Sequence, residues 1–209
     1  MTKPAAPRRI VLASASPRRR ELVASLGMQC EFASPDVDES SIPFKVPREL
    51  ALKAAFAKAV AVEPDYPNSL IVAADTIVTM NGRVYMKPED EADACRMLSE
   101  LSGRTHTVIS GVAVKESGKA MLLDAVETRV HIRQIEPDEI AEYVATREPL
   151  DKAGAYAAQG MGQKFIQQIE GDYYNVVGLP LEKLLMMMSL FLDVTAYRLK
   201  LKSLAGRVI

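Results

Sequence analysis

Short apolar runs rich in β-branched residues alternate along the chain with longer segments in which apolar positions recur every three or four residues. The short runs predict strands at Ile10–Ala13, Leu70–Ala74, Val108–Val114, Glu127–Ile132 and Phe165–Ile169. The longer segments predict helices at Arg18–Leu26, Pro47–Val62, Glu89–Leu101 and Pro137–Ala145. This alternation is typical of a layered α/β protein built around a mostly buried sheet.

Two turn signals predict antiparallel pairing within that sheet. Asn81–Gly82 separates the apolar runs Ile77–Met80 and Val84–Met86, which is the spacing of a two-residue β-hairpin. Glu116–Gly118 is expected to turn a second hairpin. The sheet should therefore be mixed, unlike the purely parallel sheet of a doubly wound nucleotide fold.

The C-terminal third carries three further signals. Gly171–Leu181 predicts a turn, a short strand and a helix that opens near Pro180. The apolar stretch Leu184–Leu192 has the length of a buried helix. Tyr197–Lys202 is basic and amphipathic, which favours a C-terminal helix packed on the body over a surface for a partner or a membrane. We expect an arm over residues 1–9, one domain over residues 10–192 and a basic, helical tail over residues 193–209.

Composition and charge narrow the classes of partner. A chain of 209 residues with 48% hydrophobic content can bury a substantial core. Its 26 basic and 27 acidic residues balance, so the summed field does not favour duplex nucleic acid. The two cysteines have neither disulfide-framework nor zinc-site spacing, and no segment resembles a signal peptide or a membrane span. These features predict a cytoplasmic protein that does not bind membranes.

Hydroxyl and guanidinium groups gather in the run SASPRR at residues 14–19, between a predicted strand and a predicted helix. A helix N-terminus presents free N–H groups, and arginine one turn into the helix adds positive charge, so this run can bind phosphate oxygens. Ser14, Ser16, Arg18 and Arg19 are the candidates. Taken alone, the run could equally be a surface turn with solvated arginines.

Carboxylates and lysines downstream could complete such a site. Asp75 follows an apolar strand, where side chains of α/β proteins commonly project into a ligand crevice, although it could also cap the strand exit. Lys87 precedes a proline at the mouth of a helix, a good position for a cation that meets phosphate. Lys53 and Lys58 lie five positions apart on one helix, so only one of them should face a site.

Two loops add further candidates. The acidic run Asp36–Glu39 is either a solvated turn or a source of oxygen ligands for a hard divalent cation. Asp151–Gly162 is so rich in glycine and alanine that it implies close backbone approach, and its Gln159 could read the edge of a base. His106 and His131 lie in strand-like runs and are expected to be packed side chains. P-loop, dinucleotide-binding and nucleophile-elbow motifs are absent.

Together these segments resemble the Maf family of nucleotide pyrophosphatases over roughly Ile10 to Phe191. The motifs are SASPRR at residues 14–19, Asp38–Glu39, Ala74–Thr76, Lys87–Pro88, LSG at 101–103, DKAGAY at 151–156 with Gln159–Gly160, and GDYY at 171–174 with GLP at 178–180. The resemblance implies an α/β fold with an elongated mixed sheet, flanking helices and a central nucleotide-binding cleft, similar to that of inosine triphosphatases. It also implies a divalent metal and hydrolysis of nucleoside triphosphates to monophosphate and pyrophosphate.

By position, the resemblance implies that Asp75 accepts a proton and that Arg18, Thr76 and Gln159 govern nucleotide selectivity. The expected phosphate-binding residues are Ser14, Ser16, Arg18, Arg19, Lys58 and Lys87. Spacing from Arg18 favours Lys58 over Lys53 as the family's lysine, but the surrounding pattern leaves Lys53 open. Glu39 and Asp75 are the expected ligands of Mg²⁺ or Mn²⁺.

The form of the DKAGAY motif resembles the branch of the family that acts on dTTP and UTP, with modified pyrimidine nucleotides as further candidate substrates. Two alternatives stay open: a family enzyme that prefers 7-methyl-GTP, and a non-catalytic nucleotide-binding regulator of cell division. The expected partners are a nucleoside triphosphate and a second copy of the chain in a homodimer.

Overall fold

A mixed seven-stranded sheet runs through the protein, whose structure, a computed structural model, describes residues 9–116 and 118–205. The strands are β1 (Ile10–Ala13), β2 (Glu31–Ala33), β3 (Leu70–Met80), β4 (Arg83–Tyr85), β5 (Thr105–Glu116), β6 (Leu122–Ile132) and β7 (Ile166–Glu170). Their order is β2-β1-β3-β5-β6-β7, and β4 pairs with β3 outside this path. β1 is parallel to both of its neighbours and the other pairs are antiparallel, which confirms the predicted mixed sheet.

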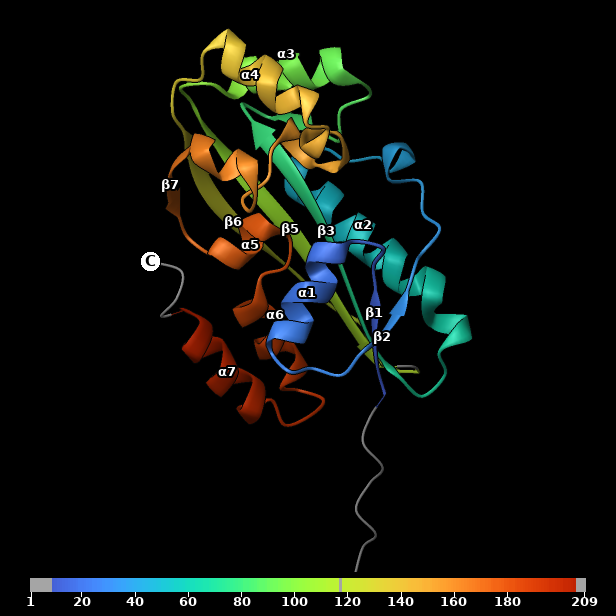
Figure 1. The fold of residues 1–209 in the computed structure, drawn as a ribbon. Coiled ribbons are helices and arrows are strands. Elements are labelled where there is room, and N and C mark those ends of the chain that lie inside the picture. Colours follow the sequence, from blue (N-terminus) through green and yellow to red (C-terminus); the bar gives the residue numbers. More distant parts are fainter. Residues whose placement is uncertain (1–8, 117, 206–209) are drawn as a thin grey trace, which may run out of the picture.

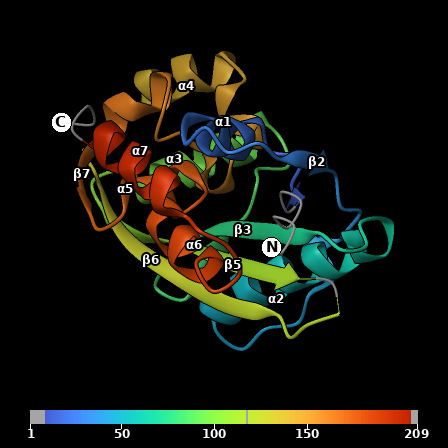
Figure 2. The ribbon, with the colours of Figure 1, turned by 90° about the horizontal axis from the view of Figure 1, so that it is seen from below.

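Helices cover both faces of the sheet (Figures 1 and 2). They are α1 (Pro17–Ser25), α2 (Pro47–Val62), α3 (Glu91–Leu101), α4 (Pro137–Ala145), α5 (Tyr173–Val177), α6 (Leu181–Met188) and α7 (Thr195–Ala205). Helix α2 covers one face, while α1, α5, α6 and α7 pack on the other. Helices α3 and α4 close one end of the long strands, where they share a second core with β3, β5 and β6.

Small residues bring α2 unusually close to the sheet. Its buried face is mostly alanine, with Ala51, Ala55 and Ala59 fully buried. A Cβ atom on Gly111 of β5 would lie 2.1 Å from the backbone oxygen of Ala51, so only glycine permits this approach. The close packing matters for function because Lys58, on the same face of α2, can then reach side chains of β3.

The structure corrects the predicted boundaries of β3. Residues Leu70–Ala74 and Ile77–Met80 form one strand, since β5 pairs with β3 continuously from Leu70 to Thr79. Asp75 therefore lies in the middle of a strand and not at its end. Likewise, the two runs that flank residues 116–118 pair antiparallel as β5 and β6, as the predicted hairpin requires, although Ser117 lies outside the described residues.

The C-terminal third contains two further corrections. Residues 173–177 form helix α5 where a strand is expected, because the Asp172 side chain caps the helix by accepting N–H bonds from Tyr174 and Asn175. Helix α6 ends at Met188, four residues before Leu192. Helix α7 packs on the body through Tyr197, among others. Among the described residues, no helix has both the length and the apolar character that crossing a membrane requires.

Candidate active site

The middle of β3 has one free edge, and the candidate site is built around it. β1 pairs with β3 only as far as Ala73, and β4 begins to pair at Val78. Residues 74–77 of β3 therefore have no strand partner on that side among the described residues. Asp75 and Thr76 are adjacent there, so their side chains point to opposite faces of the sheet. The gap in strand pairing thus coincides with two polar side chains, one on each face of a buried strand.

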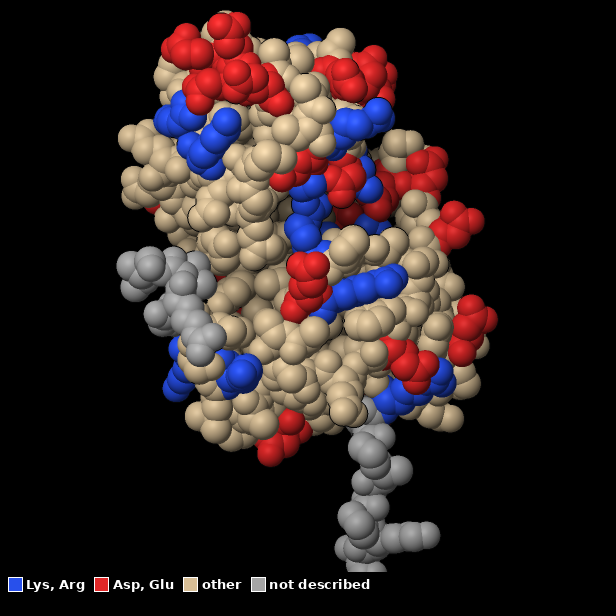
Figure 3. Space-filling view, in the orientation of Figure 1, with Lys and Arg blue, Asp and Glu red and all other residues tan. Residues whose placement is uncertain are grey.

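A cavity of about 320 Å³ opens at this gap. Its walls come from the start of α1, the middle of β3, α2, the segment before α3, the loop after α4 and the end of α5. All ten residues expected from the sequence line it, namely Ser14, Ser16, Arg18, Arg19, Glu39, Lys58, Asp75, Thr76, Lys87 and Gln159. In the space-filling view, basic and acidic side chains crowd around the hollow at the centre of this face (Figure 3).

The start of α1 can bind an anion. Pro17 occupies the first turn and the preceding Ser16 makes no capping bond through its hydroxyl, so both that hydroxyl and the first-turn N–H groups can serve a ligand. Ser14 is more constrained, because its hydroxyl oxygen accepts bonds from the Ser16 N–H (3.2 Å) and from Arg19 Nη1 (3.3 Å). Arg18 makes no hydrogen bond or ion pair with another described residue and lines the cavity, so its guanidinium can bind phosphate.

One lysine joins two carboxylates at the floor of the cavity. Lys58 Nζ lies 2.6 Å from Asp75 Oδ1 and 2.5 Å from Glu39 Oε1. The Lys58 and Asp75 side chains are 9% and 6% exposed, so this pair is well removed from water. Lys53, by contrast, is exposed and bonds to Glu49 and the backbone oxygen of Pro43. The structure therefore places Lys58 and not Lys53 in the cavity.

The two carboxylates around Lys58 also fit a metal that arrives with the substrate. Glu39 and Asp75 converge on one point that already holds a cation, and carboxylate oxygen is the ligand that Mg²⁺ prefers. The described residues contain no group of three or more His, Cys, Asp or Glu side chains that could hold a metal. A site with two protein carboxylates suits Mg²⁺, which usually takes its remaining ligands from water and substrate phosphates. The neighbouring Asp38 instead caps a short 3-10 helix (Glu39–Ser41).

Thr76 has a different environment from the one expected of a base-reading side chain. Its hydroxyl oxygen lies 3.0 Å from Arg19 Nη2, 2.8 Å from Ser110 Oγ and 3.1 Å from the backbone oxygen of Gly178. A hydroxyl has one donor and two acceptor sites, and these three partners fill them. The Thr76 hydroxyl is therefore satisfied by protein groups and keeps no free donor or acceptor with which to read a base.

Arg19 is part of the same buried network. Its Nε donates to the backbone oxygen of Gly178 at 2.8 Å, in addition to its bonds to Ser14 and Thr76. Burial lowers the pKa of the Arg19 guanidinium, and the nearby carboxylates of Asp75 and Glu39 oppose that effect. At most two N–H groups of Arg19 remain for a ligand. Arg19 thus holds α1, β3 and the end of α5 together, and Arg18 is the freer cation.

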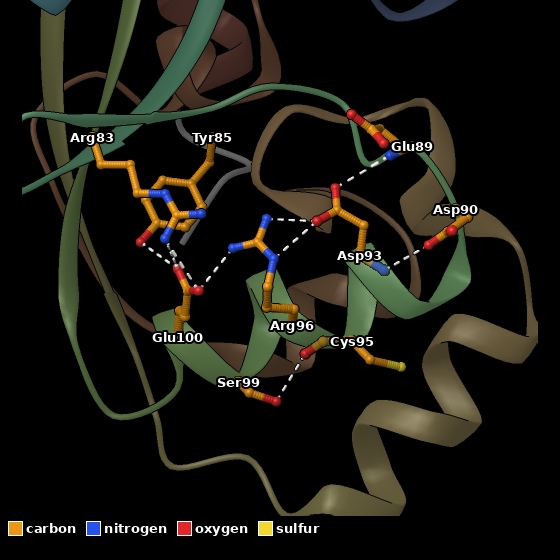
Figure 4. A network of polar contacts seen from close by, with 9 residues as sticks. All are labelled: Arg83, Tyr85, Glu89, Asp90, Asp93, Cys95, Arg96, Ser99 and Glu100. Carbon is orange, nitrogen blue, oxygen red and sulfur yellow. Dashed lines mark hydrogen bonds and ion pairs between the residues drawn. The ribbon is translucent and has the colours of Figure 1, made fainter.

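Lys87 enters the cavity from a segment that is fixed on both sides. Before it, the Tyr85 hydroxyl donates to Glu100 on α3 (2.9 Å), and after it, the Glu89 N–H donates to Asp93 (3.2 Å). The network in Figure 4 joins Arg83, Tyr85, Glu89, Asp90, Asp93, Arg96 and Glu100. Lys87 itself is exposed and has no hydrogen bond or ion pair with another described residue, so its ammonium can meet an anionic ligand.

Another part of the cavity is lined by apolar side chains, and we call it the apolar slot. Val78, Met86, Val108, Tyr156 and Val176 line it, and the exposed Gln159 also borders the cavity. A planar base can fill such a slot while an amide contacts its polar edge. Sequence reasoning identified Gln159 but missed the apolar wall. A signal for this wall was present in the sequence. Side chains alternate between the two faces of a sheet, so the even-numbered apolar residues of β3, and those that pair with them on β5, lie on the face that carries Thr76.

His106 lies behind the wall of this slot and confirms the prediction of a packed histidine. It is 2% exposed, and its Nε2 lies 2.7 Å from the Tyr156 hydroxyl. His131 is half-buried, and its Nδ1 lies 2.8 Å from the Thr105 hydroxyl. Burial lowers the pKa of His106 to about 4, with a smaller contribution from His131. His106 therefore stays neutral at physiological pH and holds Tyr156 as an uncharged partner.

We expect His106 to make the protein less stable as the pH falls from 7 to 5. The unfolded chain protonates this histidine near pH 6.5, whereas the folded protein resists protonation until about pH 4. The unfolded state therefore binds more protons in this window, and wild type should lose about 2 kcal/mol more than His106→Gln between pH 7 and pH 5. Urea unfolding of both proteins at the two pH values measures this difference, and equal losses would contradict the expectation.

The chain is similar to known proteins over most of its length. The family described as Maf-like protein matches residues 9–191. A dTTP/UTP pyrophosphatase of Moorella thermoacetica is 47% identical over 184 residues, which cover 88% of this chain and 95% of the relative. One of Geobacter sulfurreducens is 48% identical over 174 residues, 83% of this chain and 91% of the relative. The solved structure of a HAM1 protein from Coxiella burnetii superposes with a TM-score of 0.43 at 18% identity, covering 96% of this chain and 98% of that one.

Proposed function

The chain belongs to the Maf family, and from that premise we propose that it is a dTTP/UTP pyrophosphatase, a hydrolase that converts these triphosphates to the monophosphate and pyrophosphate. One observation of the structure supports this most directly. A single cavity is lined by a buried carboxylate, several cations, apolar side chains and the amide of Gln159. That layout fits the triphosphate and the base of one nucleotide.

The cations are arranged for a reaction at the α-phosphate. Attack of water on the α-phosphorus forms a new P–O bond and breaks the bond to the oxygen that bridges to the β-phosphorus, so negative charge grows on the departing pyrophosphate. Arg18, Lys87 and the first turn of α1 can bind these oxygens. Because the protein holds these groups in place before the reaction, their reorganisation does not add to the barrier.

Asp75 is the proton acceptor in this proposal. Lys58 bonds to its Oδ1, which orients the carboxylate and leaves Oδ2 to hold the attacking water and take its proton. Glu39 shares Lys58 and balances its charge. A divalent metal held by Glu39 and Asp75 together with the phosphates would neutralise phosphate charge as a Lewis acid. We propose Mg²⁺ or Mn²⁺ as that metal.

Gln159 is the proposed reader of the pyrimidine. Its amide offers both a donor pair and an acceptor, which suit the alternating carbonyl and N–H groups of uracil and thymine. We expect Gln159→Glu to lower kcat/KM for dTTP and UTP about tenfold relative to purine triphosphates, because the variant exchanges a donor for a charged acceptor. Steady-state kinetics with dTTP, UTP and the purine triphosphates measure this ranking, and an unchanged ranking would remove Gln159 from base recognition.

A substrate panel tests the proposed function as a whole. Incubation with normal, modified-pyrimidine and 7-methyl-guanine triphosphates, each with Mg²⁺ or Mn²⁺, should release pyrophosphate most rapidly from dTTP and UTP. Binding without turnover would favour the regulatory alternative, and fastest release from 7-methyl-GTP would favour the other branch of the family. We also propose that the enzyme acts in the cytoplasm and as a homodimer, which fractionation and sedimentation can test.

A further inference from the structure

One loop carries Gln159 and forms a wall of the cavity, yet its position depends on residues outside the cavity. We call residues 151–162 the Gln159 loop. Several of its residues line the cavity, including Lys152, Tyr156 and Ala158. Gln159 itself is exposed, and none of its own side-chain atoms bonds to a described residue. Its placement therefore has to come from the backbone on either side of it.

Glu148, which precedes the loop, bonds to both of its ends. At the near end, the backbone oxygen of Glu148 accepts a bond from Lys152 Nζ at 2.6 Å. At the far end, the Glu148 carboxylate accepts the N–H groups of Met161 (3.2 Å) and Gly162 (3.0 Å). These bonds fix the two ends of the loop on either side of Gln159.

Tyr143 on α4 completes this arrangement. Its hydroxyl donates to Glu148 Oε1 at 2.9 Å and accepts the N–H of Ala157 at 3.2 Å. Tyr143 is 2% exposed, and its ring packs edge-on against Phe165 with ring centroids 5.1 Å apart. The Tyr143 hydroxyl is thus a fixed point that holds the loop two residues before Gln159, while Glu148 holds it two residues after.

Two glycines show how closely the loop fits these side chains. A Cβ atom on Gly160, whose φ is +89°, would lie 2.8 Å from Glu148 Oε2. A Cβ atom on Gly162 would lie 2.6 Å from the Tyr143 hydroxyl oxygen. Both distances are too short for any other residue without movement. The close backbone approach that this glycine-rich run predicts is therefore an approach to Glu148 and Tyr143 and not only to a ligand.

The charge of Glu148 suits this role. Burial alone would raise the pKa of its carboxyl, but the N–H groups of Gly162 and Met161 and the Tyr143 hydroxyl bring it below its usual value. The group is therefore an ionised acceptor for three donors at neutral pH. A glutamine in its place would turn one acceptor oxygen into an NH₂ group that faces N–H or O–H donors.

We infer that Glu148, held by Tyr143, is a positioning residue for nucleobase selectivity: it touches no substrate but sets the place of Gln159. The inference rests on the proposed function, in which Gln159 reads the pyrimidine. If Glu148 only stabilised the fold, its loss would lower stability and leave the ranking of substrates unchanged. If it positions Gln159, its loss changes that ranking.

The test compares Glu148→Gln with Glu139→Gln. Glu139 is a matched control, because it pairs with Arg133 near the start of α4 and makes no hydrogen bond or ion pair with the described residues of the Gln159 loop. We expect Glu148→Gln to lower the preference for dTTP and UTP over purine triphosphates about tenfold, mainly through KM, since each lost hydrogen bond loosens the base reader. Glu139→Gln should keep the wild-type preference even if it melts at a lower temperature.

Tyr143→Phe is the second variant. It keeps both backbone bonds of Glu148 to the far end of the loop and loses the bond to Ala157, so we expect a smaller shift in the same direction. If Glu148→Gln does not fold, this variant decides the matter, and an unchanged preference would overturn the inference. For folded Glu148→Gln, an unchanged preference beside a changed one in Gln159→Ala would overturn it too, while the proposed base reading would stand.

Hydrogen exchange keeps the two proposals separable. Glu148→Gln should speed amide exchange at Ala157, Met161 and Gly162 at least tenfold relative to Glu139→Gln. The N–H groups of Met161 and Gly162 bond to the carboxylate that is replaced, and the N–H of Ala157 bonds to the Tyr143 hydroxyl that this carboxylate holds. Unchanged exchange at all three would overturn the positioning role whatever the kinetics show. If exchange changes but Gln159→Ala leaves the substrate ranking intact, base reading by Gln159 fails and the inference of selectivity fails with it.

Discussion

Turnover of dTTP by Asp75→Asn is expected to fall at least about 10³-fold, because asparagine keeps the shape of the side chain but cannot accept the proton of the attacking water. Asp75 is almost fully buried beside Lys58, and of the two other described carboxylates that line the cavity, Glu39 shares Lys58 and Asp151 pairs with Lys152. Release of pyrophosphate under saturating dTTP and Mg²⁺ measures the loss.

A matched carboxylate separates chemistry from charge. Asp65 is exposed and remote from the cavity, so Asp65→Asn makes the same change in net charge and should turn over like wild type. Asp75→Asn should retain dTTP binding, since Arg18, Lys87 and the start of α1 are untouched. Turnover by Asp75→Asn within about tenfold of wild type would show that another group accepts the proton.

The elements that could be predicted residue for residue are those with strong local signals. Helices α2 and α4 begin and end where the sequence indicates, because each has proline at its first position, and α4 has a clear apolar periodicity as well. Strand β2 (Glu31–Ala33) could not be found this way. It has three residues, two of them exposed, and it exists only because β1 offers backbone partners.

Contacts between residues far apart in the sequence determine two features that the local pattern could not predict: the length of β3 and the partners of Thr76. The apolar run of β3 stops at Asp75 in the sequence, but β5 pairs with β3 on both sides of Asp75, so the polar residues do not end the strand. The motifs predicted which residues line the cavity, because each type suits phosphate or base. They could not show that the Thr76 hydroxyl is already satisfied, since its partners Ser110 and Gly178 lie 34 and 102 positions away along the chain.

The structure also divides the four predicted cationic side chains into two groups with different surroundings. Arg18 and Lys87 are unpaired among the described residues and can bind phosphate, whereas Arg19 and Lys58 are committed to protein groups. Arg19 and Lys58, which are both buried, therefore contribute to the stability of the fold as well as to the site. Removal of either member should change folding and turnover together, and the larger change is expected at Lys58.

Lys58→Met is expected to lower the free energy of unfolding by about 3 kcal/mol and to abolish most turnover. Methionine fills nearly the same volume but leaves the carboxylates of Asp75 and Glu39 close together, with no cation between them. Urea unfolding at pH 7.5 measures the loss. Lys53→Met is the control on the same helix: its exposed ion pair with Glu49 should contribute less than about 1 kcal/mol, and turnover should persist.

Two further experiments test whether repulsion between the carboxylates of Asp75 and Glu39 causes the loss of stability in Lys58→Met. The double variant Lys58→Met/Glu39→Gln removes one of the two charges, so it should regain part of the lost stability while staying inactive. Mg²⁺ should raise the melting temperature of Lys58→Met more than that of wild type, because a divalent cation can take the place between Glu39 and Asp75 that the ammonium occupied. If Lys58→Met unfolds at the same urea concentration as Lys53→Met, then the Lys58 ammonium does not hold these carboxylates together, and the metal site inferred from their convergence loses its support.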